Sequence, residues 1–303
     1  MTDLSKPIYS NNDAARKHLE GIRWANGTFC PHCGEAENVH RLGGKAGEQG
    51  MWHCRSCRRK FSVTVGTVFE RSHIPLPKWL LAVDLMAASK KGVSAHQLHR
   101  MLGITYKSAW FMAHRIREAM KEGAWPGPLG GSGKVVEADE TYIGRKKGME
   151  VRRSAAHKLA VMSLVERGGK VRSFKVDGGV TSGSVRKVLS EQVDKASVLM
   201  TDDAGYYKKA GKQFADHQSV NHSAEEYVRG LAHTNTIEGF FSIFKRGMKG
   251  IYQHCGEQHL KRYLTEFDFR YNHRAALKIT DEMRAVALLK GIEGRRLTYR
   301  RTH

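Results

Sequence analysis

Four cysteines form two Cys-x-x-Cys pairs near the start of the chain, Cys30 with Cys33 and Cys54 with Cys57. Zn²⁺ takes four thiolates in a tetrahedron at about 2.3 Å, and two tight turns that face each other supply that donor set. Redox-active Cys-x-x-Cys motifs occur singly at the start of a helix, which is not the pattern here. The spacing therefore predicts one structural Zn²⁺ in a small ribbon that needs the metal to stay folded.

Three carboxylates stand where the sequence pattern ends a strand or begins a helix. Asp139 ends one apolar strand, Asp202 ends another, and Glu238 begins a helix that follows a third predicted strand. If the strands with the two aspartates are neighbours, the three side chains can converge. Two Mg²⁺ or Mn²⁺ ions about 4 Å apart need that many anionic oxygens, one ion activating the attacking oxygen and the other stabilising the leaving group.

Other polar residues compete for roles at this predicted site. The rival carboxylates are Glu137 and Glu140 for the first position and Asp203 for the second. We prefer Asp202 because it alternates onto the same strand face as Val198 and Met200. Three residues flank the third carboxylate and would orient it, bind DNA or, for the asparagine, cap the helix: His222, His233 and Asn235.

The charge of the chain indicates its class of partner. Its 303 residues carry 51 Lys and Arg against 30 Asp and Glu, a formal charge of +21, and nucleic acid is the polyanion that such an excess favours. No apolar stretch reaches the roughly 20 residues that span a bilayer, and the polar start has no signal-peptide core. We therefore expect a cytoplasmic, nucleoid-associated protein with no membrane partner.

Residue composition and hydrophobic pattern divide the chain into four regions. We expect a zinc ribbon over residues 1–74, a helical DNA-binding region over 75–123, a Gly- and Pro-rich linker over 124–134, and a mixed α/β domain with C-terminal helices over 135–303. In the last region the pattern runs strand, hairpin pair, helix, strand, short helix, strand and then longer helices. The two aspartates thus fall at the ends of strands of one predicted sheet.

The helical region contains a candidate helix-turn-helix. A short Leu-Gly-Ile turn at residues 102–104 joins two amphipathic segments, an arrangement that can place the second helix in the major groove. Tyr106 and Lys107 would open that recognition helix, and Arg115 on the same helix is a further candidate for DNA contact. The alternative is an ordinary helical hairpin that packs on the ribbon.

Three segments, EADETYIGRKK, LMTDDAGYY and HTNTIEGFFSIFKRGMKGIYQHCGEQHLKRYLTEFDFRYNHR, resemble prokaryotic DDE-type insertion-sequence transposases with an N-terminal zinc ribbon. The resemblance covers nearly the whole chain. It implies a ribonuclease H-like catalytic fold, binding to the terminal inverted repeats and to target DNA as double strands, and cutting and joining through two Mg²⁺ or Mn²⁺ ions. A homo-oligomer on DNA is expected by the same analogy.

Carried over to this sequence, the acidic triad of the family falls on Asp139, Asp202 and Glu238, and its frequent lysine falls on Lys245. Lys245 is seven residues after Glu238 and Lys249 eleven, so both lie near one helix face and could hold a DNA phosphate. Two rival functions stay open at this point. They are a non-catalytic DNA-binding regulator and a metal-dependent nuclease that cleaves without joining.

Overall fold

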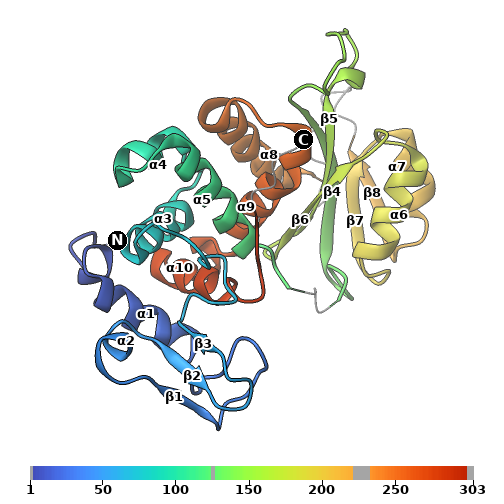
Figure 1. Cartoon of the computed structure of the whole chain (residues 1–303). Helices are drawn as coiled ribbons and strands as arrows, with labels where there is room; N and C mark the ends of the chain where they lie inside the picture. The colour runs from blue at the N-terminus through green and yellow to red at the C-terminus, as the bar shows by residue number, and fades with distance from the viewer. Residues whose placement is uncertain (1–2, 124–126, 221–232, 299–303) are drawn as a thin grey trace. The chain divides into compact units, whose positions relative to one another are not determined.

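The computed structural model describes residues 3–123, 127–220 and 233–298. Its contacts divide the chain into two compact units, Met1–Lys121 with Lys278–His303 and Glu122–Leu277. Within the described ranges, no helix has the length and apolar character to cross a bilayer. Figure 1 labels the elements of both units.

The first unit combines a small antiparallel sheet with a group of helices. Its sheet has the order β1-β2-β3. Its elements are η1 (Pro7–Tyr9), α1 (Asn12–Arg23), β1 (Val39–Arg41), α2 (Gly44–Glu48), β2 (Trp52–Cys54), β3 (Lys60–Phe61), α3 (Leu76–Ala88), α4 (Ala95–Leu102), α5 (Tyr106–Ala119) and α10 (Asp281–Lys290). The ribbon and the helical region, which we expected as separate domains, thus form one unit.

The last helix, α10, belongs to this first unit. It packs against α3 and α1, with Leu288 and Leu289 buried, and the Arg284 guanidinium donates a 2.9 Å hydrogen bond to the carbonyl of Ala87 at the end of α3. We expected these residues within the region 135–303, whereas the division by contacts groups Lys278–His303 with the first unit. The α3 segment is apolar almost all round, so it needs cover on several sides, and α10 supplies part of it.

The second unit is built on a mixed sheet with the strand order β6-β5-β4-β7-β8. Strands β4, β5 and β6 pair antiparallel, whereas β7 and β8 are added parallel to β4. Its elements are β4 (Val135–Ile143), η2 (Ala155–His157), β5 (Leu159–Glu166), β6 (Val171–Val176), α6 (Ser182–Gln192), β7 (Val198–Asp202), α7 (Gly205–Gly211), β8 (Asp216–Val220), α8 (Asn235–Gly247), the π-helix η4 (Met248–Tyr252), η5 (Glu257–His259), α9 (Leu260–Asn272) and η6 (Ala275–Leu277). This is the ribonuclease H-like arrangement, so the expected fold class is confirmed.

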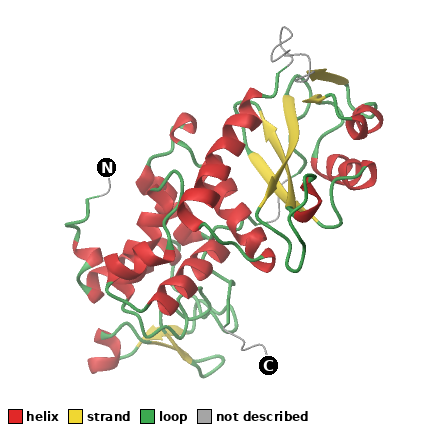
Figure 2. Cartoon of the chain, turned by 90° about the horizontal axis from the view of Figure 1, so that it is seen from above, coloured by secondary structure: helices red, strands yellow, loops and turns green. Residues whose placement is uncertain are grey.

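Helices cover both faces of this sheet (Figure 2). One face packs with α6 and α7 in a core that includes Leu164 and Leu189, and the other packs with α8 and α9 in a core that includes Val161 and Phe244. Strand β5 is apolar along nearly its whole length because both of its faces are buried. The strand ends that carry polar residues are therefore the parts of the sheet available for chemistry.

The expected linker is largely part of the second unit. Leu129 is buried, forms a parallel bridge with Val193, and exchanges backbone hydrogen bonds with Gln192 and Asp194 at 2.7 and 2.8 Å. The Gly and Pro content indicated a flexible connection. The burial of Leu129 in the core instead fixes this part of the segment. Residues 124–126 lie outside the described residues.

Candidate metal and catalytic sites

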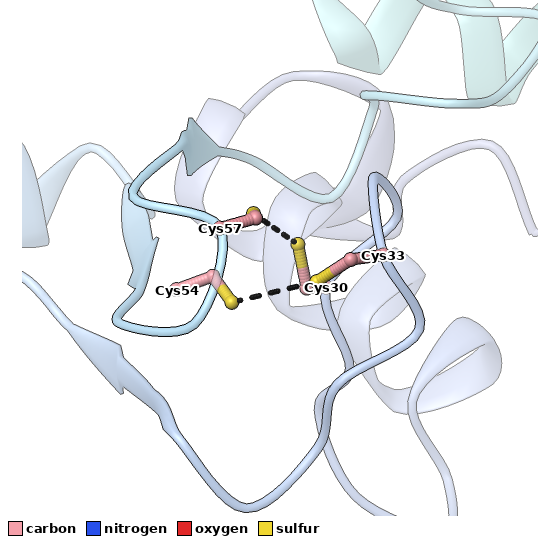
Figure 3. Close-up of side chains that lie close together, drawn as sticks. All are labelled: Cys30, Cys33, Cys54 and Cys57. Atoms are coloured by element: carbon pink, nitrogen blue, oxygen red, sulfur yellow. Dashed lines mark hydrogen bonds between the residues drawn. The ribbon is translucent and has the colours of Figure 1, made fainter.

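The four paired cysteines converge in the ribbon (Figure 3). The Sγ atoms of Cys30 and Cys57 are 3.6 Å apart, those of Cys33 and Cys54 are 3.7 Å apart, and all four lie within 4.8 Å of one another. A tetrahedral ion with Zn–S bonds of about 2.3 Å requires S–S edges of about 3.8 Å. The sulfur atoms thus already have the spacing that a bound Zn²⁺ would need.

Each pair sits on a tight turn whose backbone the sequence allows. The Gly34 N–H donates to the carbonyl of Cys30 at 2.8 Å, and the Cys54 N–H donates to the carbonyl of Arg59 at 3.0 Å. The residue after each second cysteine has a left-handed backbone, Gly34 with φ +81° and Arg58 with φ +57°. The backbone N–H of Cys57 also lowers the pKa of Cys54 to about 7, which favours the thiolate that binds metal.

The acidic site lies where β4 and β7 run side by side. Glu137 pairs with Met200 in the parallel register, so two residues further along Asp139 and Asp202 are neighbours on the same face of the sheet. Asp203 lies just after the end of β7 and is exposed. The alternation that favoured Asp202 is thus present in the structure.

Asp139, Glu140 and Asp202 form one group, in which one carboxylate oxygen from each residue lies within 4.8 Å of the other two. The pKa of Asp139 is raised to about 8, first because the side chain is buried, and then because the charges of Glu140, Asp202 and Glu238 oppose its ionisation. Glu238 therefore acts on the same aspartate although its own oxygens are not in the close group. A bound divalent cation would neutralise this repulsion between the carboxylates, so the residues suit a metal site.

Glu140 is held from the α7 side by two tyrosines that the sequence analysis missed. The hydroxyls of Tyr206 and Tyr207 donate to its two carboxylate oxygens, the second at 2.9 Å. Burial raises the pKa of Glu140, and the tyrosine hydrogen bonds lower it in part. The signal in the sequence was the place of the two tyrosines, four and five residues after Asp202 on a predicted short helix.

Glu137 lies on the same face of β4 as Asp139 but has a structural role. Its side chain is fully buried and accepts from the Arg167 Nε at 2.6 Å, the Thr236 hydroxyl at 2.9 Å and the Ile237 backbone N–H at 2.9 Å. A carboxylate at the first turn of α8 also meets the positive end of the helix dipole. Glu137 thus fastens the start of α8 to β4, next to the strand position of Asp139.

The residues that flank Glu238 have separate roles. The Thr234 hydroxyl donates to Glu238 Oε1 at 2.8 Å, and Thr234 occupies the position before the first residue of α8. His233 Nδ1 lies 3.5 Å from Glu137 Oε1, so this histidine contacts the buried carboxylate. Asn235 is exposed at the first turn of α8.

The two predicted lysines lie beyond Glu238 on the following turns. Lys245 is in the last turn of α8 and is exposed, as is Glu238. Lys249 is exposed too, but it lies in the π-helix Met248–Tyr252, whose wider turn changes its angular offset from Glu238. His222 lies outside the described residues.

The helix-turn-helix segment of the first unit forms as two helices and a tight turn. Ser94 caps α4, Gly103 turns with φ +58°, and Thr105 caps α5 by accepting from the Ser108 N–H at 3.2 Å. Tyr106 and Lys107 are exposed in the first turn of α5. The ring of Tyr106 stacks on that of His96 at 4.2 Å.

Arg115 does not share that exposure. Its side chain is only 6% exposed, its guanidinium stacks over the ring of Trp79 at 5.2 Å, and it donates to the carbonyl of Glu70 at 2.6 Å. Burial lowers its pKa. The second half of α5 is core, so we leave Arg115 out of the proposed DNA contacts.

A four-cysteine ribbon followed by a ribonuclease H-like sheet with clustered carboxylates defines the class of transposases that carry an N-terminal zinc ribbon. The sequence model of the ISXO2-like transposase domain matches residues 128–272, and that of the transposase zinc-ribbon domain matches residues 10–60. An uncharacterized protein in transposable element ISH50 of Halobacterium salinarum (strain ATCC 700922 / JCM 11081 / NRC-1) is 30% identical over 269 residues, which cover 83% of this chain and 88% of that protein. The chain belongs to this family of insertion-sequence transposases.

The solved structures include a similar chain as well. A Mos1 transposase paired-end complex with left transposon end is similar at 13% identity and a TM-score of 0.29, over 70% of this chain and 75% of that chain.

Proposed function

We propose that the chain cuts and joins DNA at the acidic site of its second unit, with Asp139, Asp202 and Glu238 holding two Mg²⁺ or Mn²⁺ ions. The observation that carries this is the juxtaposition of Asp139, in the middle of β4, with Asp202, at the end of the adjacent strand β7, with the charge of Glu238 acting on Asp139. When bound, the ions supply Lewis-acid stabilisation of the attacking and leaving oxygens. The proposal extends the family membership to a specific reaction.

The reaction balances as two displacements at phosphorus. In cleavage, a water oxygen bonds to phosphorus, the bond to the 3′ oxygen breaks, and that oxygen takes up a proton to become a 3′ hydroxyl. In joining, such a hydroxyl attacks a phosphodiester of the target and displaces its 3′ oxygen, so the number of phosphoester bonds is unchanged. The carboxylates bind and orient, and the Lys245 ammonium positions a phosphate beside them.

The geometry adds Glu140 to the proposed site. Its oxygens belong to the close group, yet both also accept from tyrosine hydroxyls. We assign it the role of a positioning carboxylate that keeps negative charge beside Asp139 and Asp202. The ribbon is proposed to hold one structural Zn²⁺ on Cys30, Cys33, Cys54 and Cys57.

Double-stranded DNA is the proposed partner of both units. The exposed first turn of α5, with Tyr106 and Lys107, would contact the ends of the element, and Lys245 and Lys249 would contact phosphates near the chemistry. A homo-oligomer on DNA stays a prediction, which the mass of the DNA complex by light scattering would test.

The test removes one anionic ligand at a time while it keeps the shape of the side chain. Asp139→Asn, Asp202→Asn and Glu238→Gln should each reduce Mg²⁺-dependent cleavage and joining by about 10³-fold or more, with zinc content and DNA affinity unchanged. Asp203→Asn is the matched control and should keep full activity. Joining is measured with a pre-cut end, so a nuclease without joining is recognised by cleavage alone.

The outcomes separate the rival functions. If all four variants stay active, the carboxylates are not the catalytic set. If DNA binding collapses together with activity in every carboxylate variant, these residues are structural and a regulator is the better description. Glu140→Gln should be milder than the triad variants, because its amide oxygen still accepts from one tyrosine.

A further inference from the structure

The β4–β5 hairpin extends past the acidic site as a two-stranded arm. Asp139 pairs with Ser163, and the pairing continues for four more residues to Ile143 opposite Leu159, whereas β7 ends at Asp202. Figure 1 shows the hairpin continuing beyond the ends of β7 and β8. The residues that join the two strands, 144–158, are called the basic tip below.

The basic tip concentrates positive charge. It contains six basic residues and one acidic residue, Glu150, a formal charge of +5 in fifteen residues. Five of the basic side chains are exposed and form no ion pair with any residue that the structure describes: Arg145, Lys147, Arg152, Arg153 and Lys158. Charges that are close in sequence and unpaired repel one another unless a polyanion lies against them.

The basic tip is nevertheless an ordered segment. The Lys146 N–H donates to the carbonyl of His157 at 2.8 Å, and its ammonium donates to the carbonyl of Ala156 at 3.0 Å. His157 is buried, with Nδ1 3.0 Å from the carbonyl oxygen of Ser154. These contacts close the base of the tip and leave the unpaired cations to point outward.

We propose that the basic tip is a second DNA-binding surface, which holds the phosphate backbone beside the segment being cut. This rests on the proposed function, because the arm starts at the strand position of Asp139. Four residues of strand span about 13 Å, and at about 3.4 Å of helix axis per nucleotide the tip meets DNA roughly four nucleotides from the reacting phosphate. Its contacts are to phosphate and carry no base sequence.

The experiment compares two charge-matched variants of the full chain. The tip variant carries Arg145→Ala, Lys147→Ala, Arg152→Ala and Arg153→Ala. The control removes four exposed cations of α6 and α7 in the same unit, with Arg186→Ala, Lys187→Ala, Lys208→Ala and Lys209→Ala. Both lose the same formal charge, so a general electrostatic effect is equal in the two, and melting curves check that both remain folded.

The measured quantity is the affinity for a fluorescein-labelled duplex of mixed sequence between about 50 and 200 mM KCl. The slope of log Kd against log salt should fall by about 2–4 in the tip variant, since each lost phosphate contact removes about 0.9, and by less than about 1 in the control. Equal changes in the two variants, or an unchanged slope in the tip variant, would overturn the proposal.

Cleavage is followed separately with Mg²⁺ on the same proteins. A wild-type chain without metal-dependent cleavage defeats the proposed function, but the salt slopes still decide the role of the tip. Conversely, unaltered slopes with an active wild type defeat the tip proposal alone. If the tip variant loses cleavage with no change in slope, the tip acts on something other than DNA phosphate, and the proposal fails.

Discussion

The two groups of metal-ligating residues in this chain are built in opposite ways. The four thiols of the ribbon come from two turns, and their Sγ atoms all lie within 4.8 Å of one another, the spacing that suits a closed tetrahedral site. The carboxylates come from separate strands and a helix, and burial with mutual repulsion raises the pKa of Asp139 to about 8. The ribbon group would thus gain folding stability from a metal, whereas the carboxylate group opposes folding through its charge until a cation is bound.

The largest expected effect is at the ribbon. Cys54→Ser, or removal of zinc by a chelator, should unfold residues 1–74, because the apparent binding energy of a structural zinc is about 10 kcal/mol or more and the ribbon has little core of its own. Zinc content and limited proteolysis measure the change. The matched Cys255→Ser variant removes a thiol outside the group and should keep both zinc and protease resistance. A ribbon that stays folded without zinc would break the comparison.

The second prediction concerns a carboxylate that is buried but paired. Glu137→Ala should lower the free energy of unfolding by about 3–5 kcal/mol, because it leaves the Arg167 guanidinium and the Ile237 N–H without their acceptor. Chemical denaturation measures this value. Glu137→Gln is the control and should cost less, since its amide oxygen still accepts one of these bonds.

A small loss in Glu137→Ala would mean that α8 does not depend on this contact. Glu137, a buried acid that stabilises the fold, would then no longer differ from Asp139, a buried acid that destabilises it. The two acids lie two residues apart on one strand face, so backbone position is held constant and only the partners differ.

The features that the sequence predicted are those that depend on local residue patterns. The ribbon follows from two turns, and the sheet follows from alternation and turn residues, so both agree with the structure. Alternation also places Asp202 on one strand face with Val198 and Met200, and the register with β4 puts this face beside Asp139. Asp202 ends its strand as expected, but the expectation that Asp139 ends its strand was wrong, because β4 continues to Ile143 in its pairing with β5.

What the sequence did not predict depends on partners far along the chain. The apolar residues of α10 predict a helix with one buried face, but they do not predict its packing partner. In the structure α10 packs against α3. Alternation places Glu137 and Asp139 on one face, but the structural role of Glu137 depends on its contacts with Arg167, Thr236 and Ile237. Arg115 occurs on a helix whose first turn is exposed, and only the packing of Trp79 over it shows that its own turn is core.

The smallest effect sharpens the comparison through pH. Asp139 has an unfolded pKa of about 3.9, and its folded pKa is raised to about 8, so in this interval the folded state binds more protons than the unfolded state. The contribution of Asp139 to the free energy of unfolding of the metal-free protein should therefore be most favourable below about pH 4. It should fall as pH rises towards 8. A group with a lowered folded pKa would give the opposite slope.

Asp139→Asn removes this titration and should flatten that part of the profile. At pH 8 without metal the variant should exceed the wild type by on the order of 1–3 kcal/mol, although it is inactive. Added Mg²⁺ should raise the melting temperature of the wild type and leave the variant nearly unchanged, because a ligand stabilises only the state that binds it. Asp203→Asn, exposed and outside the group, should follow the wild type in both measurements. If Asp139→Asn is instead less stable at pH 8, or gains as much from Mg²⁺ as the wild type, then the carboxylate group is not held under repulsion, and the two metal sites differ in their ligands alone.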